Sequence, residues 1–356
     1  MLAAINSAEQ SVRLEMYIYT PSSIGERFLE ALVKACQRGV RVRVLVDSWG
    51  SMTTSAKFWD PLRAAGGEFR WFNPLRLDRC GIRNHRKLLS CDDSVAFVGG
   101  FNIAPEYEGD GITRGWHDLG LQIQGPLAKE LGTSFDTLFA LADFQHKRFT
   151  ALRKARLRNI ISTHDGQILL TGPGRGKSFL KWALLNDLSK AKAIRIISAY
   201  FLPTRPLRRA LAYAARRGAR VQLILAGKSD VPLSQLACRG FYQSFLKAGI
   251  EIYEYQPQIL HAKMLVFDDV IYAGSANLDR RSLYINYELM VRVPHRELAA
   301  EAREMFEDDL RHSRKIDAAT WKKSRTFWNK LKENWAFFFL ARLDPLIARR
   351  QLKYLR

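Results

Sequence analysis

The 356-residue sequence has few cysteines and few acidic residues relative to basic ones. None of its four cysteines forms a Cys-x-x-Cys pair, which argues against a zinc site or a disulfide framework and fits a reducing compartment. Only 35 Asp and Glu oppose 56 Lys and Arg, which gives a formal net charge of +21. This excess indicates an anionic partner, such as nucleic acid, an acidic membrane surface or a phosphate-bearing substrate.

Long hydrophobic runs are also missing. No stretch approaches the roughly 20 apolar residues that a membrane-spanning helix needs. The N-terminus has no basic segment followed by an apolar one, so we expect no signal peptide. With 47% hydrophobic residues, the chain is expected to be globular and to form two domains of about 150 residues each.

A short pattern, His-x-Lys-x-x-x-x-Asp, occurs twice, at residues 85–92 and 261–268. An apolar run and a Gly-rich stretch ending in Asn102 or Asn277 follow each copy. Ahead of each copy the residues favour a strand, a helix and a second strand, in that order; these segments are 11–19, 26–38 and 40–47 in the first half and 193–201, 206–217 and 219–226 in the second. The repeat indicates a duplicated α/β unit.

We therefore expect a first domain over residues 1–150, a second over 151–316 and a basic, aromatic tail over 317–356. A basic helical connector is expected near 125–158. The second half has an additional strand at 167–172, whose counterpart in the first half would precede Met1. We expect the first domain to lack this edge strand, either by design or because the true start of the protein lies further upstream.

Strand geometry places the His and Lys of the pattern on a different face from the Asp. Because side chains alternate between faces, the His and Lys of each copy share a face, whereas Asp92 and Asp268 have the opposite parity. We expect these two acids to be structural, at tight hairpin turns. Folding back about these turns brings Asn102 toward His85, and Asn277 toward His261. Ser275 lies beside Asn277, and the first half has Gly100 at the matching position.

These side chains together suit phosphoryl chemistry. The predicted site combines His85, Lys87 and Asn102 with His261, Lys263, Asn277 and Ser275. Lysine and asparagine donate to phosphate oxygens. One neutral histidine attacks phosphorus while the other protonates the leaving oxygen. Asp118 and Glu288, which follow His85 and His261 in their own halves, are the expected partners that fix the tautomers.

The duplicated pattern, with the runs 83–89, 97–102 and 274–282, resembles the phospholipase D superfamily and its bacterial cardiolipin synthase branch. The resemblance implies two α-β-α sandwich domains with pseudo-twofold symmetry and an active site at their interface. It implies transfer of a phosphatidyl group between two phosphatidylglycerol molecules, without metal or cofactor, through a phosphohistidine. His85 is then the nucleophile and His261 the acid and base. The alternatives are a phosphodiesterase that hydrolyses phospholipid or nucleic acid, and a binding protein without activity.

The tail has apolar residues at helical spacing among basic ones. The apolar positions are Trp321, Phe327, Trp328, Leu331, Trp335, Phe338, Phe339 and Leu343, and the basic ones are Lys322, Lys323, Arg325, Lys330 and Lys332. Such a helix packs on the core or lies on anionic lipid, and we favour the second interpretation. The expected partners are an anionic phospholipid membrane surface and phosphatidylglycerol, with no obligatory protein partner and with nucleic acid unlikely. Some relatives have two N-terminal spanning helices, which are absent here, so we expect the shorter, peripheral type at the cytoplasmic face of a bacterial inner membrane.

Residues 171–178 imitate a phosphate-binding loop, Gly-x-x-x-x-Gly-Lys-Ser. The first position is Thr171 rather than Gly, and no acidic magnesium ligand follows a parallel strand in the expected place. We interpret this stretch as a basic turn and not as a nucleotide site.

Overall fold

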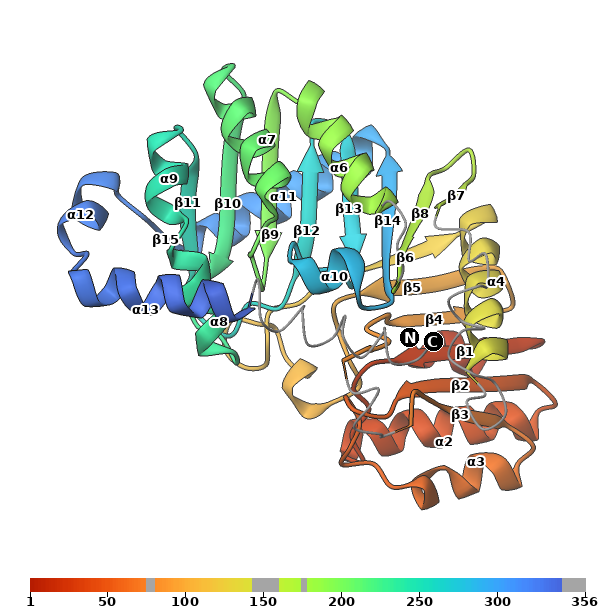
Figure 1. Cartoon of the computed structure of the whole chain (residues 1–356). Coiled ribbons are helices and arrows are strands. Elements are labelled where there is room, and N and C mark those ends of the chain that lie inside the picture. The colour runs from red at the N-terminus through yellow and green to blue at the C-terminus, as the bar shows by residue number, and fades with distance from the viewer. Residues whose placement is uncertain (75–80, 143–159, 174–177, 341–356) are drawn as a thin grey trace.

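The computed structural model describes residues 1–74, 81–142, 160–173 and 178–340, and shows two α/β units side by side (Figure 1). The first unit contains a six-stranded sheet with the order β3-β2-β1-β4-β5-β6. The second contains a nine-stranded sheet with the order β15-β11-β10-β9-β12-β13-β14-β8-β7. The boundary predicted at residue 150 lies outside the described residues, as does most of the basic end of the predicted connector.

The first unit begins at the N-terminus. Its strands are β1 (Ser11–Met16), β2 (Arg41–Asp47), β3 (Glu68–Phe72), β4 (Leu88–Cys91), β5 (Val95–Gly99) and β6 (Gly120–Gln124). Its helices are α1 (Leu2–Ser7), α2 (Ser23–Gln37), α3 (Asp60–Ala64) and α4 (Pro126–Leu141), with 3-10 turns η1 (Ala56–Trp59) and η2 (Pro105–Tyr107). The Ser22 side chain caps α2 by accepting from the Gly25 amide, and α2 buries Phe28 and Leu32. Strands β1 to β3 are parallel, whereas β4 to β6 run antiparallel.

The second unit repeats this topology. Its strands are β7 (Ile160–Ser162), β8 (Gln167–Thr171), β9 (Ala193–Ser198), β10 (Arg220–Ala226), β11 (Glu251–Tyr255), β12 (Lys263–Phe267), β13 (Val270–Gly274), β14 (Glu288–Pro294) and β15 (Ser313–Lys315). Its helices are α6 (Phe179–Lys190), α7 (Arg205–Arg216), α8 (Pro232–Arg239), α9 (Tyr242–Lys247), α10 (Arg280–Tyr284) and α11 (Arg296–Arg311), followed by α12 (Ala318–Lys323) and α13 (Phe327–Phe338). The order β11-β10-β9-β12-β13-β14 matches the whole first sheet. Strand β8 is the additional strand predicted at 167–172, and it has no counterpart among the described strands of the first sheet.

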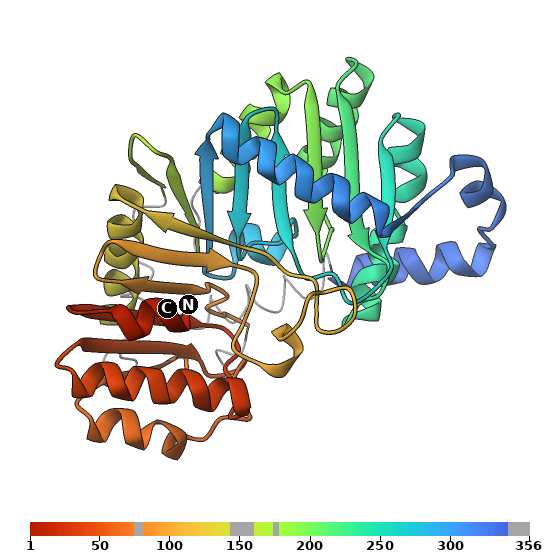
Figure 2. The ribbon, with the colours of Figure 1, turned by 180° about the vertical axis from the view of Figure 1, so that it is seen from behind.

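Helices cover both faces of the second sheet. Helices α6, α7 and α9 pack on one face, and α11 crosses the other, as the view from behind shows (Figure 2). In the first unit, α2 and α3 pack on one face. Helix α4 lies on the other and contributes Leu131 and Phe135 to a core that also contains Leu289 and Val291 of β14. The two units therefore share a hydrophobic core, which fixes one sheet against the other.

Both expected hairpins form, and their registers agree with the sequence pattern. Strand β4 pairs with β5 through Leu88 and Val98, and β12 pairs with β13 through Met264 and Ala273. These registers carry the chain back toward the two histidines at the same end of each sheet.

The motif acids lie at the opposite end of the hairpins. Asp92 and Asp268 have φ angles of 54° and 52°, in the left-handed region that Asp tolerates in tight turns. The Asp92 carboxylate accepts the backbone N–H groups of residues 9, 10 and 11 at 2.8–2.9 Å. Asp268 accepts the amides of residues 192 and 193 at 2.8–3.1 Å. Each acid thus joins its hairpin turn to the start of the neighbouring first strand.

Helix α13 has two apolar stripes. One packs inward through Ala336 and Phe337, and the ring of Phe337 lies 5.0 Å from that of Phe241. The other stripe faces solvent and consists of Phe327, Trp328, Leu331, Trp335 and Phe338. We call this second set the exposed stripe of α13.

Two tail residues do not lie on the exposed stripe. Trp321 packs against Tyr242 at 5.0 Å, and Arg325 forms an ion pair with the buried Glu333. The prediction that they belong to a membrane face is wrong, because α12 and the start of α13 anchor the tail to α8 and α9. Leu343 lies outside the described residues. Among the helices of the described ranges, none combines the length and apolarity needed to cross a membrane.

Candidate functional site

Backbone hydrogen bonds between the two units set the position of each histidine. The N–H of His85 donates to the carbonyl of Tyr287 at 2.9 Å. The N–H of His261 donates to the carbonyl of His117 at 2.7 Å. Each accepting residue directly precedes the acid of its own unit. The two histidine segments therefore cross the interface and meet the acid of the other unit.

The acid–histidine pairs are accordingly crossed. His85 Nδ1 lies 2.9 Å from Glu288 Oε2, and His261 Nδ1 lies 2.6 Å from Asp118 Oδ2. The predicted pairing within each half is wrong, because the interface hydrogen bonds place each acid beside the opposite histidine. A charged carboxylate only accepts, so Nδ1 carries the proton in both rings and Nε2 is left for a substrate.

The two pairs differ in what supports the acid. Ser275 Oγ donates to Glu288 Oε2 at 2.6 Å and accepts from the Leu289 amide at 3.0 Å. In the other unit a Cβ at Gly100 would lie 2.3 Å from Asp118 Oδ1. Asp118 therefore needs the space that Gly100 leaves by having no side chain, whereas Glu288 is held by the hydroxyl of Ser275.

Both motif lysines are buried beneath the histidines. The exposed fractions of Lys87 and Lys263 are 1% and 2%. Lys87 Nζ donates to the carbonyl of His85 at 2.8 Å, and Lys263 Nζ donates to that of His261. Lys263 Nζ also lies 2.9 Å from His261 Nδ1, but that nitrogen already donates to its acid, so this approach is a contact and not a hydrogen bond. The strands begin at residues 88 and 263, so both histidines lie just ahead of regular strand.

Burial controls the protonation of these groups. Burial lowers the pKa of Lys87 to about 7 and that of Lys263 to about 8. Burial, and then the charge of Lys263, lowers the pKa of His261 to about 4. The pKa of His85 is also lowered, chiefly by burial, against the opposing effect of Glu288. Burial opposes ionisation of Glu288, but the charge and hydrogen bond of His85 prevail and leave its pKa below the ordinary value.

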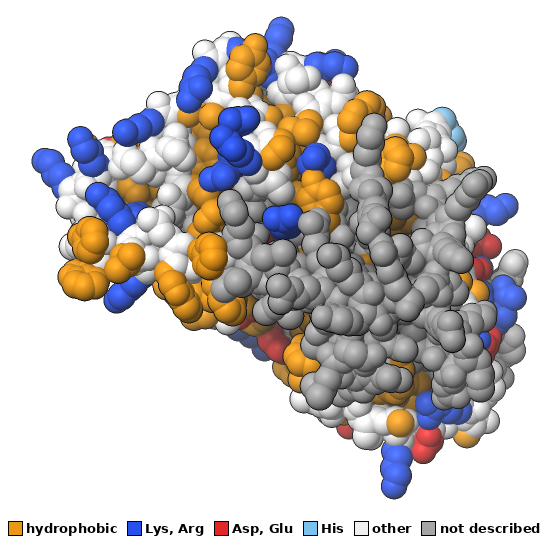
Figure 3. All heavy atoms as spheres, viewed as in Figure 1, with side chains coloured by type: hydrophobic (Ala, Val, Ile, Leu, Met, Phe, Trp, Pro, Cys, Tyr) orange, Lys and Arg blue, Asp and Glu red, His pale blue; other side chains and the backbone are white. Residues whose placement is uncertain are grey.

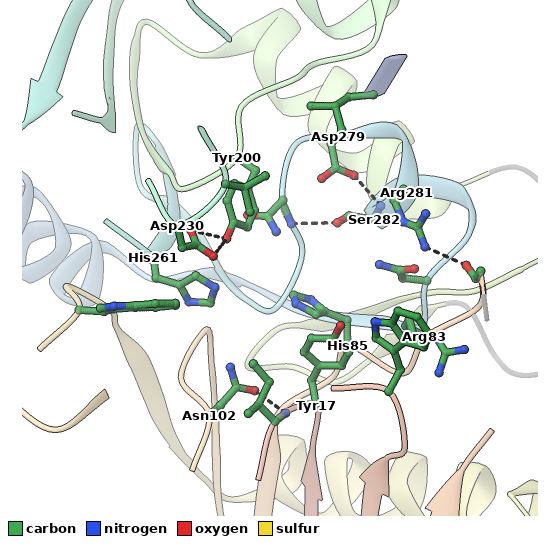
Figure 4. A pocket seen from close by; sticks show the side chains of 18 of the residues that line it. Tyr17, Arg83, His85, Asn102, Tyr200, Asp230, His261, Asp279, Arg281 and Ser282 are labelled. Carbon is green, nitrogen blue, oxygen red and sulfur yellow. Dashed lines mark hydrogen bonds between the residues drawn. The ribbon is translucent and has the colours of Figure 1, made fainter. Parts of the chain in front are cut away.

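The histidines and asparagines face one cavity of about 650 Å³ (Figure 4). Asn102 Nδ2 donates to the hydroxyl of Tyr107 at 2.7 Å, and its Oδ1 accepts from the Ile18 amide at 3.0 Å. The buried Oδ1 of Asn277 has no hydrogen-bond partner among the described residues. The Asn277 backbone N–H donates to Ser282 Oγ at 3.3 Å and so fixes the residue at the cavity wall.

Aromatic and charged groups complete the cavity wall, and the sequence pattern did not assign them to the site. They are Tyr17, Trp49, Arg83, Tyr107, Trp116, Tyr200, Asp230, Asp279 and Arg281, with Phe339 and Leu340 from the end of the tail. The ring of Tyr17 lies 4.8 Å from that of His85, and the Trp116 ring lies 5.5 Å from that of His261. Arg281 Nη2 donates to the Gly81 carbonyl at 2.9 Å and so reaches from α10 into the first unit.

Some of these residues had a signal in the sequence. Arg83 and Arg281 lie inside two of the three runs that carry the family resemblance, and Trp116 lies two residues before Asp118. Tyr17 closely follows β1, and Tyr200 closely follows the matching strand β9. Their approach to the histidines, however, depends on how the sheet edges meet, which periodicity does not encode.

Comparison with known proteins agrees with this architecture. A family model described as "Cardiolipin synthase, PLD-like domain" matches residues 1–138 and 184–310. Cardiolipin synthase of Clostridium perfringens (strain SM101) is 33% identical over 340 residues, which cover 91% of this chain and 70% of that protein. Cardiolipin synthase B of Salmonella typhi is 30% identical over 365 residues, which cover 97% of this chain and 85% of that protein.

Solved structures share the fold. Phosphatidylserine synthase of Haemophilus influenzae superposes with a TM-score of 0.72 at 16% identity, over 98% of this chain and 91% of that one. Polyphosphate kinase of Porphyromonas gingivalis gives a TM-score of 0.59 at 17% identity, over 100% of this chain and 50% of that one. At these identities the likeness concerns the fold alone. Given the family match and the identity to the curated relatives, this chain belongs to the cardiolipin synthase branch of the phospholipase D-like family and is a phosphatidyltransferase.

Proposed function

We propose that this enzyme joins two phosphatidylglycerol molecules to form cardiolipin and releases glycerol. The carrying observation is the pair of histidines on one cavity, each with Nδ1 bound by the acid of the other unit. This arrangement leaves two Nε2 atoms for one phosphodiester. A cavity of about 650 Å³ has the size usual for small-molecule sites, and the names of the curated relatives support the substrate.

In the first step, Nε2 of His85 attacks the phosphorus of the first phosphatidylglycerol. The bond between phosphorus and the headgroup oxygen breaks, and that oxygen takes a proton from Nε2 of His261. Glycerol leaves, and the phosphatidyl group remains on His85 as a phosphohistidine. His85 is placed in this role by the family resemblance, and Glu288 offsets the positive charge that its ring acquires.

In the second step, a hydroxyl of the second phosphatidylglycerol gives its proton to Nε2 of His261. Its oxygen attacks phosphorus, the phosphorus–nitrogen bond breaks, and the electron pair returns to His85. The product is cardiolipin, and His261 is again protonated for the next cycle. The proton balance closes over the two steps without water.

The buried lysines provide positive charge for the phosphate. Lys87 and Lys263 have lowered pKa values in the empty site, and an anion bound nearby raises the pKa of an ammonium group. The same anion favours the protonated form of His261, which the first step requires. Substrate binding therefore assembles the charge state that the chemistry needs.

We further propose that the enzyme works at the surface of an anionic membrane as a peripheral protein, at its cytoplasmic face. The exposed stripe of α13 is flanked by Lys330 and Lys332, both exposed. Aromatic residues beside basic ones suit the boundary between headgroups and acyl chains. Phe339 and Leu340, directly after this helix, line the catalytic cavity. The membrane-facing helix thus ends at the site.

The decisive experiment incubates the protein with phosphatidylglycerol vesicles and EDTA and identifies products by mass spectrometry. Cardiolipin with glycerol supports the proposal, and phosphatidic acid alone indicates a hydrolase. No lipid turnover with cleavage of added DNA indicates a nuclease, which the net charge of +21 also suits. Activity in EDTA is expected because the proposed steps use only the two histidines, their acids and the buried lysines. His85→Ala and His261→Ala are each expected to lower turnover by several orders of magnitude, to a small residual rate.

A further inference from the structure

A second cavity, of about 150 Å³, adjoins the catalytic one. The two share wall residues Tyr200, Val231, Asp279, Arg281 and Leu340. The small cavity extends from this shared wall past Leu202 to Ser234 of α8, with Arg280 on its other side. We call it the α8 groove. It lies between the start of α8, the end of α13 and the start of α10.

The α8 groove is apolar where it leaves the catalytic cavity. Leu202 follows β9 and is 9% exposed, and Val231 directly precedes α8 and is 38% exposed. Leu340 comes from the end of the tail. A cavity of about 150 Å³ with apolar walls holds a hydrocarbon the size of benzene. The groove therefore suits a short run of methylene groups and not a second polar headgroup.

Charge on the groove is placed at one side. Helix α10 supplies Arg280 and Arg281 there, and Arg281 also lines the catalytic cavity. On the catalytic side, Asp230 accepts the Tyr200 hydroxyl at 2.6–2.7 Å, which holds that ring as part of the shared wall. Asp279, at the start of the same helix, also lines both cavities, so charges of both signs lie on this side, and the apolar part of a ligand has its place near Leu202 and Val231.

Leu202, an apolar residue of the α8 groove, corresponds to a polar residue, Thr20, in the first unit. Leu202 follows β9, Thr20 follows the matching strand β1, and each directly precedes a proline, Pro203 or Pro21. The hydroxyl-bearing Thr20 hydrogen-bonds the Ile103 carbonyl at 3.4 Å. At this position the described residues of the two units therefore differ, with an apolar side chain in the second unit and a hydroxyl in the first.

Helix α13 connects the groove to the outer surface. It packs on α8 through Ala336 and Phe337, and Leu340 follows it into the groove. The exposed stripe of α13 faces outward on the same side of the molecule, where hydrophobic and basic side chains gather (Figure 3). Leu340, two residues after the end of α13 at Phe338, therefore places the groove next to the end of this helix.

We infer that the α8 groove holds one acyl chain of the phospholipid whose phosphate lies between His85 and His261. This inference rests on the proposed function, because it takes the substrate to be a diacyl lipid. Its phosphate is joined through glycerol to two acyl chains, which gain nothing from a polar cavity. The groove offers one of them an apolar wall beside the catalytic cavity, at Leu202, Val231 and Leu340.

The test compares chain lengths. Transfer is measured with dioleoyl-phosphatidylglycerol in mixed micelles and with water-soluble dibutyroyl-phosphatidylglycerol, for the unsubstituted enzyme, Val231→Asp and Val231→Trp. One variant places charge in the groove and the other fills it. Each is expected to lower the ratio of kcat/KM for the long lipid over the short one by about tenfold. Met52→Asp, at a site 57% exposed and away from both cavities, is the matched control and should leave the ratio unchanged. An unchanged ratio in both Val231 variants overturns the inference.

A second measurement does not depend on turnover. Phosphatidylglycerol with a diazirine in its acyl chain is irradiated with the full-length His85→Ala protein, and the adducts are mapped by mass spectrometry. Adducts at Leu202, Ser234 or Arg280, which line the groove and not the catalytic cavity, support the inference. Adducts on the exposed stripe of α13 alone show surface binding and overturn it. If neither lipid is converted by the unsubstituted enzyme, the proposed function fails, while the crosslinks still decide whether the groove binds an acyl chain.

Discussion

Asp118 of the first unit hydrogen-bonds His261 of the second, with Oδ2 and Nδ1 2.6 Å apart, although 143 residues separate them in the chain. The reciprocal pair, His85 and Glu288, spans 203 residues. Neither unit therefore contains a complete acid–histidine pair. The crossing follows from the backbone hydrogen bonds that join each histidine to the residue ahead of the opposite acid.

Neutralising either acid should slow the reaction without unfolding the protein. In Asp118→Asn and Glu288→Gln the amide no longer fixes the tautomer that leaves Nε2 free, so we expect kcat to fall by about 10²–10⁴-fold. Initial rates of cardiolipin formation measure this. Because the pairs are crossed, Asp118→Asn should add little to the loss caused by His261→Ala. Additive losses in that double variant would contradict the pairing.

The buried lysines predict an alkaline limit to activity. The pKa values of about 7 for Lys87 and about 8 for Lys263 mean that both ammonium groups lose protons as pH rises through this range. Because kcat/KM reports on the free enzyme, loss of the lysine protons should steepen its decline above about pH 7–8, beyond the decline that the His261 pKa of about 4 already produces. The plot of log kcat/KM against pH tests this. A slope that does not change between neutral pH and pH 10 would show that the lysines remain charged when no substrate is bound.

Gly100 and Ser275 occupy matching positions but should respond differently to alanine. In Gly100→Ala the new Cβ would meet Asp118 Oδ1 at 2.3 Å, so the acid must move away from His261. We expect a loss of about 10²-fold or more in kcat. Ser275→Ala removes one hydrogen bond from Glu288 and should cost about tenfold or less. Equal losses in the two variants would contradict this account of the asymmetry.

The motif acid Asp92 should govern stability and not chemistry. Asp92→Ala removes the acceptor of three backbone N–H groups and should lower the free energy of unfolding by about 1–3 kcal/mol. Although burial opposes ionisation, these amides hold the folded pKa below the ordinary value. The stabilisation is therefore present above about pH 4 and is lost as pH falls through the folded pKa. Urea unfolding at pH 7 and pH 3 measures the difference, and kcat of the folded variant should be near that of the unsubstituted enzyme.

Membrane binding should depend on the exposed stripe of α13. Trp335 is 61% exposed, so Trp335→Glu should leave Tm nearly unchanged but lower the affinity for phosphatidylglycerol liposomes by about tenfold. Phe337→Ala, on the inward stripe, is the matched control and should lower Tm. Thermal unfolding measures the Tm of the two variants, and sedimentation with liposomes at low and high salt measures their affinity for the membrane. Undiminished binding by Trp335→Glu would place the membrane contact elsewhere.

Local pattern was sufficient for a large part of the fold. The alternation of strands and helices, the duplicated topology and the hairpin registers follow from periodicity and turn residues, because these depend on neighbours in sequence. The parity of Asp92 and Asp268 placed them away from the histidines for the same reason. Which side of the tail faces solvent was harder to predict, because α13 carries apolar residues on two stripes. Packing against the neighbouring helices decides which stripe is buried.

The sequence by itself determined which residue types meet: two histidines, two lysines and two asparagines in duplicated units. Tertiary structure decided which acid serves which histidine, that Asn277 keeps an unpaired oxygen, and that Tyr17 and Trp116 flank the rings. The physical reason is that the sheets meet across a shared core and exchange backbone hydrogen bonds. Contacts between such distant segments depend on the packing of whole units, which no local period in the sequence records.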